Sequence, residues 1–166
     1  MPSGNGSSIL EWEMTEGAFI LYRNGDSWGS MVHQPPRYDV NIGPCSFQLS
    51  RKGLIEPRLT VNGPCGQELG RATSLNRFEL RIELVDGGCY LHRELKEGLQ
   101  NYTIFDCQGN LVMETQNKST WKSPSMHIDL CERGLSDQDC AYLAAISLFI
   151  FLDRSKWSSH LSDCIL

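Results

Sequence analysis

The sequence lacks the short motifs that carry much of enzyme chemistry. It has no glycine-rich phosphate loop, no Gly-x-Ser-x-Gly nucleophile turn and no His-Glu-x-x-His zinc motif. The four histidines lie in four different segments, at His33, His92, His127 and His160. Because no convergent set of reactive groups is visible, we expect a protein that acts by binding, with no catalytic residue.

Paired cysteines are also lacking: the seven cysteines contain no Cys-x-x-Cys pair. One Cys/His pair, Cys89-Tyr-Leu-His92, cannot by itself close a tetrahedral zinc site. We predict free thiols that act as small apolar side chains in a reducing compartment, with Cys107 an ordinary surface thiol. No metal or organic cofactor is expected.

The first residues lack the basic start and apolar stretch of a secretory signal, so we expect a protein that is not secreted. The predicted location is cytoplasmic, with the membrane surface and the nucleus as alternatives. Positive charge is scarce, because 15 Lys and Arg face 20 Asp and Glu, a net charge of −5. Binding to nucleic acid is therefore not expected, and contact with anionic lipid would need a local basic patch.

Short alternating segments fill the chain from Ile9 to about residue 131, after a small, polar N-terminus (1–8) that we expect to be flexible. In the clearest segment, 77–85, Phe78, Leu80, Ile82 and Leu84 alternate with charged residues, as in a half-buried antiparallel strand. Turn signals such as Asn24-Gly25 separate the segments. About 10–12 strands at this spacing predict a closed barrel or a sandwich.

One segment near the C-terminus has almost no polar residue. From Cys140 to Leu152, twelve of thirteen residues are apolar, and Ser147 is the exception. Ser136-Asp-Gln-Asp139 resembles a capping box, so the pattern predicts a helix over about 137–153. A helix that is apolar on every side either crosses a bilayer or is surrounded by protein.

Length favours burial in protein, since the thirteen residues rise about 20 Å and a bilayer core is roughly 30 Å thick. We therefore predict a mainly β protein, a closed antiparallel β-barrel of about 10–12 strands enclosing one hydrophobic C-terminal helix. A single domain would span 9–157, followed by a tail at 158–166. The residues expected at the centre of the barrel are Leu143, Ile146, Leu148, Phe149, Ile150, Phe151 and Leu152.

The segment Met126–Arg154 resembles the last strand, acidic connector, apolar helix and terminal Leu-Asp of the tubby C-terminal-like superfamily, in particular phospholipid scramblases and LURP-one-related proteins. Tyr102–Val112 is similar to the strand, Asp-x-x-Gly turn and strand that recur there. The resemblance covers about residues 100–157. It implies a non-enzymatic barrel that associates with phospholipid or phosphoinositide at membrane surfaces. The basic pocket of tubby domains cannot be matched to residues here.

The resemblance also draws attention to calcium, because scramblases have an acidic segment ahead of the helix. The corresponding residues are Asp129, Glu132, Asp137 and Asp139, which do not follow the spacing of a calcium loop. A solvated connector with helix capping is the preferred interpretation, and calcium is not expected as a cofactor.

Two loops are candidates for lipid contact. One contains Arg51 and Lys52, and the other places Trp121 between Lys118 and Lys122. The preferred interpretation of both is an ordinary solvated loop. The alternative function is an intracellular protein-interaction module that binds a partner through barrel edges or through apolar residues after 155. A third alternative, a lipocalin-like binder of small molecules, needs an empty lumen.

Overall fold

The fold consists of twelve strands followed by one helix, and it is taken from a computed structural model. The structure describes residues 8–52, 58–76, 78–95, 101–120, 123–131 and 134–165, without the side chains of Lys52 and of residues after Asp153. The elements are β1 (Ile9–Thr15), β2 (Ala18–Arg23), β3 (Asp26–Gln34), β4 (Arg37–Ile42), β5 (Cys45–Lys52), β6 (Arg58–Asn62), β7 (Glu68–Ser74), β8 (Glu79–Leu84), β9 (Cys89–Glu94), β10 (Tyr102–Asp106), β11 (Leu111–Asn117), β12 (Ser125–Leu130) and α1 (Asp137–Ile165).

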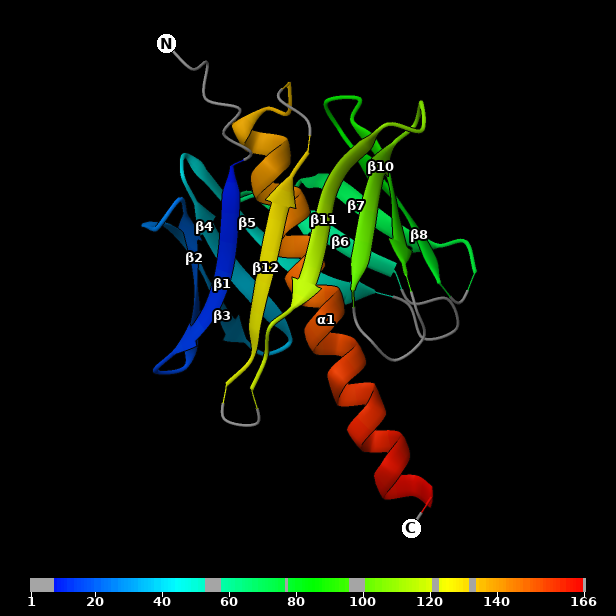
Figure 1. The fold of residues 1–166 in the computed structure, drawn as a ribbon. Coiled ribbons are helices and arrows are strands. Elements are labelled where there is room, and N and C mark those ends of the chain that lie inside the picture. The colour runs from blue at the N-terminus through cyan, green and yellow to red at the C-terminus, as the bar shows by residue number, and fades with distance from the viewer. Residues whose placement is uncertain are drawn as a thin grey trace.

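The strands form a closed barrel in which each strand pairs antiparallel with its neighbours in sequence, and β1 pairs with β12 to close the ring (Figure 1). Trp12 on β1 lies opposite Leu21 of β2 on one side and Met126 of β12 on the other. The predicted Asn24-Gly25 turn is present, with φ of 51° and 89°. These positive values suit a tight hairpin whose twist matches that of its strands. The predicted closed antiparallel barrel is confirmed.

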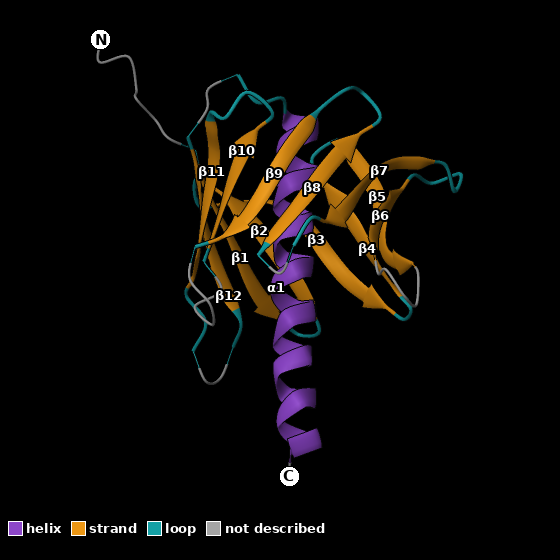
Figure 2. Ribbon diagram, turned by 90° about the vertical axis from the view of Figure 1, so that its right-hand side faces the viewer, coloured by secondary structure: helices purple, strands orange, loops and turns teal. Residues whose placement is uncertain are grey.

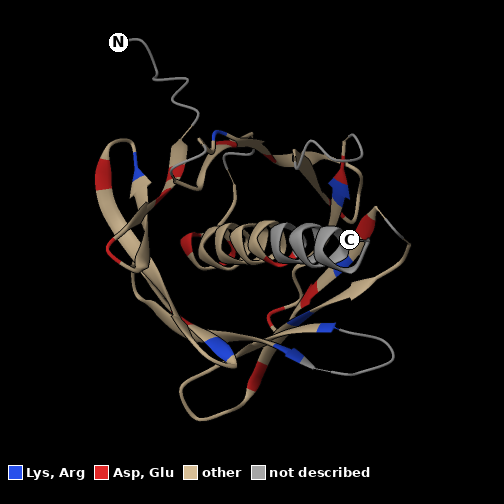
Figure 3. Ribbon diagram, turned by 90° about the horizontal axis from the view of Figure 1, so that it is seen from below, with Lys and Arg blue, Asp and Glu red and all other residues tan. Residues whose placement is uncertain are grey.

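Helix α1 passes through the middle of the barrel, which confirms the predicted central helix (Figures 2 and 3). Every residue from Cys140 to Phe151 is buried, and Leu152 is half-buried. Ser147 is fully buried as well, and its hydroxyl has no hydrogen-bond partner. Protein therefore surrounds the helix on every side, as its lack of a polar face predicted.

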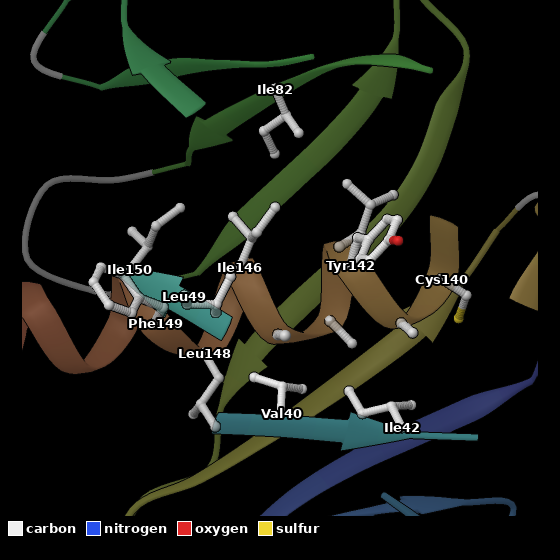
Figure 4. Packing of buried hydrophobic residues seen from close by; sticks show 14 of the residues in the cluster. Val40, Ile42, Leu49, Ile82, Cys140, Tyr142, Ile146, Leu148, Phe149 and Ile150 are labelled. Carbon is white, nitrogen blue, oxygen red and sulfur yellow. The ribbon is translucent and has the colours of Figure 1, made fainter. Parts of the chain in front are cut away.

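The barrel wall holds the middle of the helix by aromatic packing and by a hydrogen bond from Trp12. The indole Nε1 of Trp12 donates to the carbonyl oxygen of Ala144 over 3.0 Å. Phe47 and Tyr142 pack edge to face with ring centroids 4.8 Å apart. Figure 4 shows Leu148 pointing toward Val40 of β4. Because α1 occupies the lumen, the open interior that a lipocalin-like binder needs is not present.

The helix is longer than predicted. It continues as far as Ile165, whereas the expected end was near residue 153 and a separate tail was expected after 157. In the sequence, the charged pair Asp153-Arg154 closes the apolar run, and the apolar pattern therefore stops there. No glycine or proline follows before residue 166, so nothing in the local sequence ends the backbone helix there. In the part of the chain that the structure describes, no helix is long and apolar enough to cross a membrane.

The prediction of free thiols is wrong for two cysteines, because Cys89 and Cys107 form a disulfide. Tyr90 of β9 pairs with Asp106 of β10, and the adjacent residues Cys89 and Cys107 therefore lie next to each other, with Cα atoms 5.6 Å apart. Their separation of 18 residues gave no sign of this pairing. Disulfides persist mainly in oxidising surroundings. The cysteines therefore no longer support the predicted reducing compartment.

The other observations on cysteine agree better with the sequence. Cys45, Cys65, Cys131 and Cys140 are free. Burial raises the pKa of the Cys140 thiol to about 12, so this side chain stays protonated and acts as an apolar residue. Cys89 faces outward on β9 and His92 faces inward, so this pair cannot share a metal ion. A spacing of three places two residues on opposite faces of a strand.

Candidate functional site

The antiparallel order divides the connections of the barrel into two groups, one at each end (Figure 1). The upper end carries the β2–β3, β4–β5, β6–β7, β8–β9 and β10–β11 connections and the start of α1. The lower end carries the β1–β2, β3–β4, β5–β6, β7–β8, β9–β10 and β11–β12 connections, and α1 leaves the barrel there. The two ends differ in chemistry.

The upper end is acidic, and Arg23 is the one Lys or Arg that the described residues place there. Arg23 pairs with Asp137 in the first turn of α1 at 3.0 Å and lies 4.7 Å from the ring centre of Trp28. The hydroxyl of Ser136 accepts a hydrogen bond from the backbone N–H of Asp139 over 3.1 Å, which confirms the predicted helix cap. The acidic residues at this end are Asp26, Glu68, Asp86, Asp106, Asp137 and Asp139.

The calcium candidates do not gather in one place. Asp137 pairs with Arg23, and Asp139 accepts a hydrogen bond from Tyr90. Asp129 lies on the outside of β12, with an oxygen 3.2 Å from His127 Nε2, and Glu132 lies outside the described residues. Among the described side chains, no three of His, Cys, Asp and Glu come close enough together to hold a metal ion.

Asp139 is a buried carboxyl group close to a second one. The Tyr90 hydroxyl donates to Asp139 Oδ2 over 2.6 Å. A Cβ atom at Gly88 would lie 3.0 Å from Asp139 Oδ2 and 3.2 Å from Asp86 Oδ1, so the two carboxyl groups flank this glycine. Burial, with a further contribution from Asp86, raises the pKa of Asp139 above its usual value. The folded state therefore binds a proton here more tightly than the unfolded chain does.

We expect the D139N variant to lose this pH dependence of stability. The raised pKa stabilises the folded state fully at pH values below the pKa of Asp139 in the unfolded chain, near 3.8. This stabilisation is lost as pH rises through the higher pKa of Asp139 in the folded protein. Melting temperatures measured from pH 3.5 to 8 test this. The melting temperature of D139N relative to that of the wild type should rise by a few degrees between the lowest and the highest pH. Y90F is the companion variant: it removes a hydrogen bond that lowers the pKa, so the pH dependence should grow. Parallel profiles for wild type and D139N would contradict this assignment.

The lower end carries exposed apolar side chains. Among the described residues, six large apolar side chains are exposed, and four of them lie at this end. Leu75 and Leu95, 55% and 56% exposed, flank the lower ends of β7 and β9, and Phe78 is 37% exposed beside β8. Met14 lies next to the β1–β2 turn and is 43% exposed. Met14 is separated from the other three around the ring, but Leu75, Phe78 and Leu95 belong to the adjacent strands β7–β9, and such exposed apolar side chains indicate a contact with something apolar.

Lys and Arg residues are found at the lower end as well. Arg58 is exposed at the start of β6, and Lys118 is exposed just after β11. Arg51 is exposed and donates to both carboxylate oxygens of Asp153 over 3.0 and 3.1 Å, which holds α1 to β5 where the helix leaves. Beside this pair, Arg51, Arg58 and Phe149 line a hollow of about 190 Å³.

The structure thus brings the two predicted loops to the same end of the barrel. Lys52 ends β5 there, although its side chain is not described, and Trp121 and Lys122 lie outside the described residues. Sequence reasoning missed Arg58, Leu75 and Leu95. The alternating pattern also predicted that Phe78 faces the interior. In the structure Phe78 precedes the first residue of β8, at the rim of the barrel, where its side chain is exposed. The sequence does contain one sign of these exposed residues: an apolar residue next to a turn signal, such as Leu95 before Lys-Glu-Gly.

Comparisons with known proteins add one distant likeness. No family model and no curated protein matches the sequence. Among solved structures, the X-ray structure of a protein from Arabidopsis thaliana is similar, at 10% identity and a TM-score of 0.38, over 90% of this chain and 93% of that one. A likeness at this level supports no inference about function or family. The conclusions below therefore rest on the residues of this chain.

Proposed function

We propose that this chain is a non-enzymatic barrel module that associates with anionic phospholipid at membrane surfaces, through its lower end. The observation that supports the proposal is the segregation of side chains: exposed Leu75, Phe78 and Leu95 lie at the same end as Arg58 and Lys118. Apolar side chains can enter the headgroup region of a bilayer, and each nearby Lys or Arg contributes about 1 kcal/mol of attraction to an anionic leaflet.

The acidic upper end supports one orientation. Six carboxylates and a single arginine, among the described residues, would be repelled by an anionic surface, so the lower end would face the lipid. With a net charge of −5, and with Glu16, Glu79 and Glu94 also at the lower end, attraction to lipid would depend on individual cations such as Arg58 and Lys118. The resemblance of residues 100–157 to tubby-like and scramblase-like barrels agrees with this proposal. In it the chain is a peripheral protein of the cytoplasm that needs no cofactor.

Co-sedimentation with vesicles tests the proposal. The probes are vesicles of phosphatidylcholine alone, with phosphatidylserine and with a phosphoinositide, each with calcium and with a chelator. Binding to the anionic vesicles is expected, weakening as salt screens the charges. The double variant L75E/L95E should bind at least about tenfold more weakly, because it removes two apolar contacts and adds two repelled charges.

The matched control is V85E at the upper end, where Val85 is 73% exposed, and its vesicle binding should equal that of the wild type. An equal loss in V85E would show that the lower end has no special role. Absence of sedimentation with every vesicle at physiological salt would remove the lipid proposal and favour a protein partner. A difference between the phosphatidylserine and phosphoinositide vesicles identifies the headgroup.

A further inference from the structure

A groove of about 420 Å³ runs along the outside of the barrel over β8, β9 and β10 and reaches down to Leu75 at the lower end. Its floor follows from strand register. Leu91 of β9 lies between Arg81 of β8 and Phe105 of β10, and all three face outward. Arg93 lies two residues after Leu91 on β9, on the same outward face. The Cys89–Cys107 disulfide lines the upper part of the groove. A hollow of this size holds small organic ligands in many proteins.

The groove combines an apolar floor with two guanidinium groups. Arg93 lies 5.4 Å from the ring centre of Phe105, and its Nη2 is 3.3 Å from a Glu79 oxygen. Arg81 has one carboxylate neighbour, Glu83, 3.6 Å from its Nε, and its terminal nitrogens have no hydrogen-bond partner among the described residues. Both arginines are about half exposed, at 53% and 47%. A ligand can therefore reach them without displacing a buried ion pair.

One carboxylate, that of Asp106, also lines the groove, and its oxygens are already used. They accept hydrogen bonds from the backbone N–H groups of Gln108 and Asn110, each over 2.9 Å, and from the Asn110 side chain over 3.0 Å. These bonds lower the pKa of Asp106, so it is ionised and directed into its own turn. Its charge limits the anion that the groove can accept, because the carboxylates of Glu79, Glu83 and Asp106 outnumber the two guanidinium groups, so binding would depend on direct hydrogen bonds to the arginines.

We propose that this groove binds a small amphiphilic carboxylate, with the carboxylate between Arg81 and Arg93 and the apolar body on Leu91 and Phe105. A planar guanidinium matches a carboxylate through two parallel hydrogen bonds. Because these carboxylates outnumber the guanidinium groups, a singly charged anion is repelled less than a doubly charged phosphate. The ring of Phe105 and the aliphatic side chain of Leu91 suit an aromatic or short aliphatic body.

Titration with 4-phenylbutyrate, followed by amide chemical shifts of the full chain, tests this proposal. We expect saturable shifts confined to β8–β10, with a Kd near 1 mM, which is usual for a probe of about twelve non-hydrogen atoms. R81Q and R93Q should each weaken binding about tenfold, the usual effect of losing one charge-assisted hydrogen bond. The neutral analogue 4-phenylbutanol should bind about tenfold more weakly than the acid.

R37Q is the matched control, because Arg37 is 50% exposed on β4 and has a single carboxylate neighbour at 3.4 Å, as Arg81 has on β8. Its affinity for the acid should be unchanged. Equal binding of acid and alcohol, unchanged affinity in R81Q, or absence of saturable shifts would each overturn the proposal. Vesicle binding distinguishes this site from the lower end: R81Q should sediment as the wild type does, and loss of sedimentation would make the groove a lipid contact instead.

Discussion

Replacing Leu148 by aspartate is expected to abolish the folded protein. Leu148 is 1% exposed, in the buried middle of α1, and points toward Val40 of the barrel wall (Figure 4). A carboxylate there would be buried without a charged partner, and the cost of burying an unpaired charge is comparable with the roughly 5–15 kcal/mol that stabilises a whole domain. We expect L148D to appear in the insoluble fraction on expression, with no cooperative melting transition in any soluble remainder.

Two variants separate burial of charge from other effects of this substitution. L148M keeps volume and polarity, so it should cost less than about 1.5 kcal/mol. V85D introduces the same charge at a side chain that is 73% exposed and should stay soluble. If L148D had the solubility and melting temperature of the wild type, α1 could not occupy the centre of the barrel.

Replacing Gly29 by alanine is expected to produce the second largest loss of stability. Gly29 on β3 faces Ile42 of β4, and a Cβ atom would lie 2.6 Å from the Asn41 carbonyl oxygen and 2.6 Å from the Ile42 Cα. Backbone atoms of a paired strand cannot rotate away as a flexible side chain can, so β3 and β4 would have to separate. We expect G29A to lose about 2–3 kcal/mol, or roughly 5–10 °C in melting temperature.

The control for G29A is G134A in the connection before α1. A Cβ atom at Gly134 would meet no atom within 4 Å, and the backbone there has no left-handed conformation. Its stability should stay within about 0.5 kcal/mol of the wild type. Urea unfolding of the three proteins measures both values, and equal midpoints for G29A and wild type would show that the barrel accommodates a methyl group between these strands.

The candidate site was predictable only in part. Lys118 and the pair Arg51-Lys52 were visible as basic loops, because loops reveal themselves by composition. Their position at one end of the barrel depends on strand order, as does the presence of Leu75 and Leu95 beside them. The bond between Arg51 and Asp153 joins residues 102 positions apart. No local pattern could predict it, so Arg51 has a structural contact that its sequence neighbours do not indicate.

Local periodicity explains what the sequence by itself determined about this protein. Alternation along 77–85, the Asn24-Gly25 turn and the unbroken apolar run after Cys140 each depend on neighbouring residues, and they predicted strands, a hairpin and a buried helix correctly. The same reasoning placed the end of α1 too early, because a change from apolar to polar residues marks where burial ends and not where a helix ends.

Tertiary structure decided which distant residues meet. Closure of β1 on β12, the Cys89–Cys107 disulfide and the proximity of Asp139 to Tyr90 and Asp86 all follow from register around the ring. Register is set by the whole barrel closing over one helix, since a shift by one residue would turn every inward side chain outward. The scarcity of cations and of paired cysteines describes the chain as a whole. The folded barrel brings Leu75, Phe78 and Leu95 to one end, and it joins two cysteines that the sequence keeps apart.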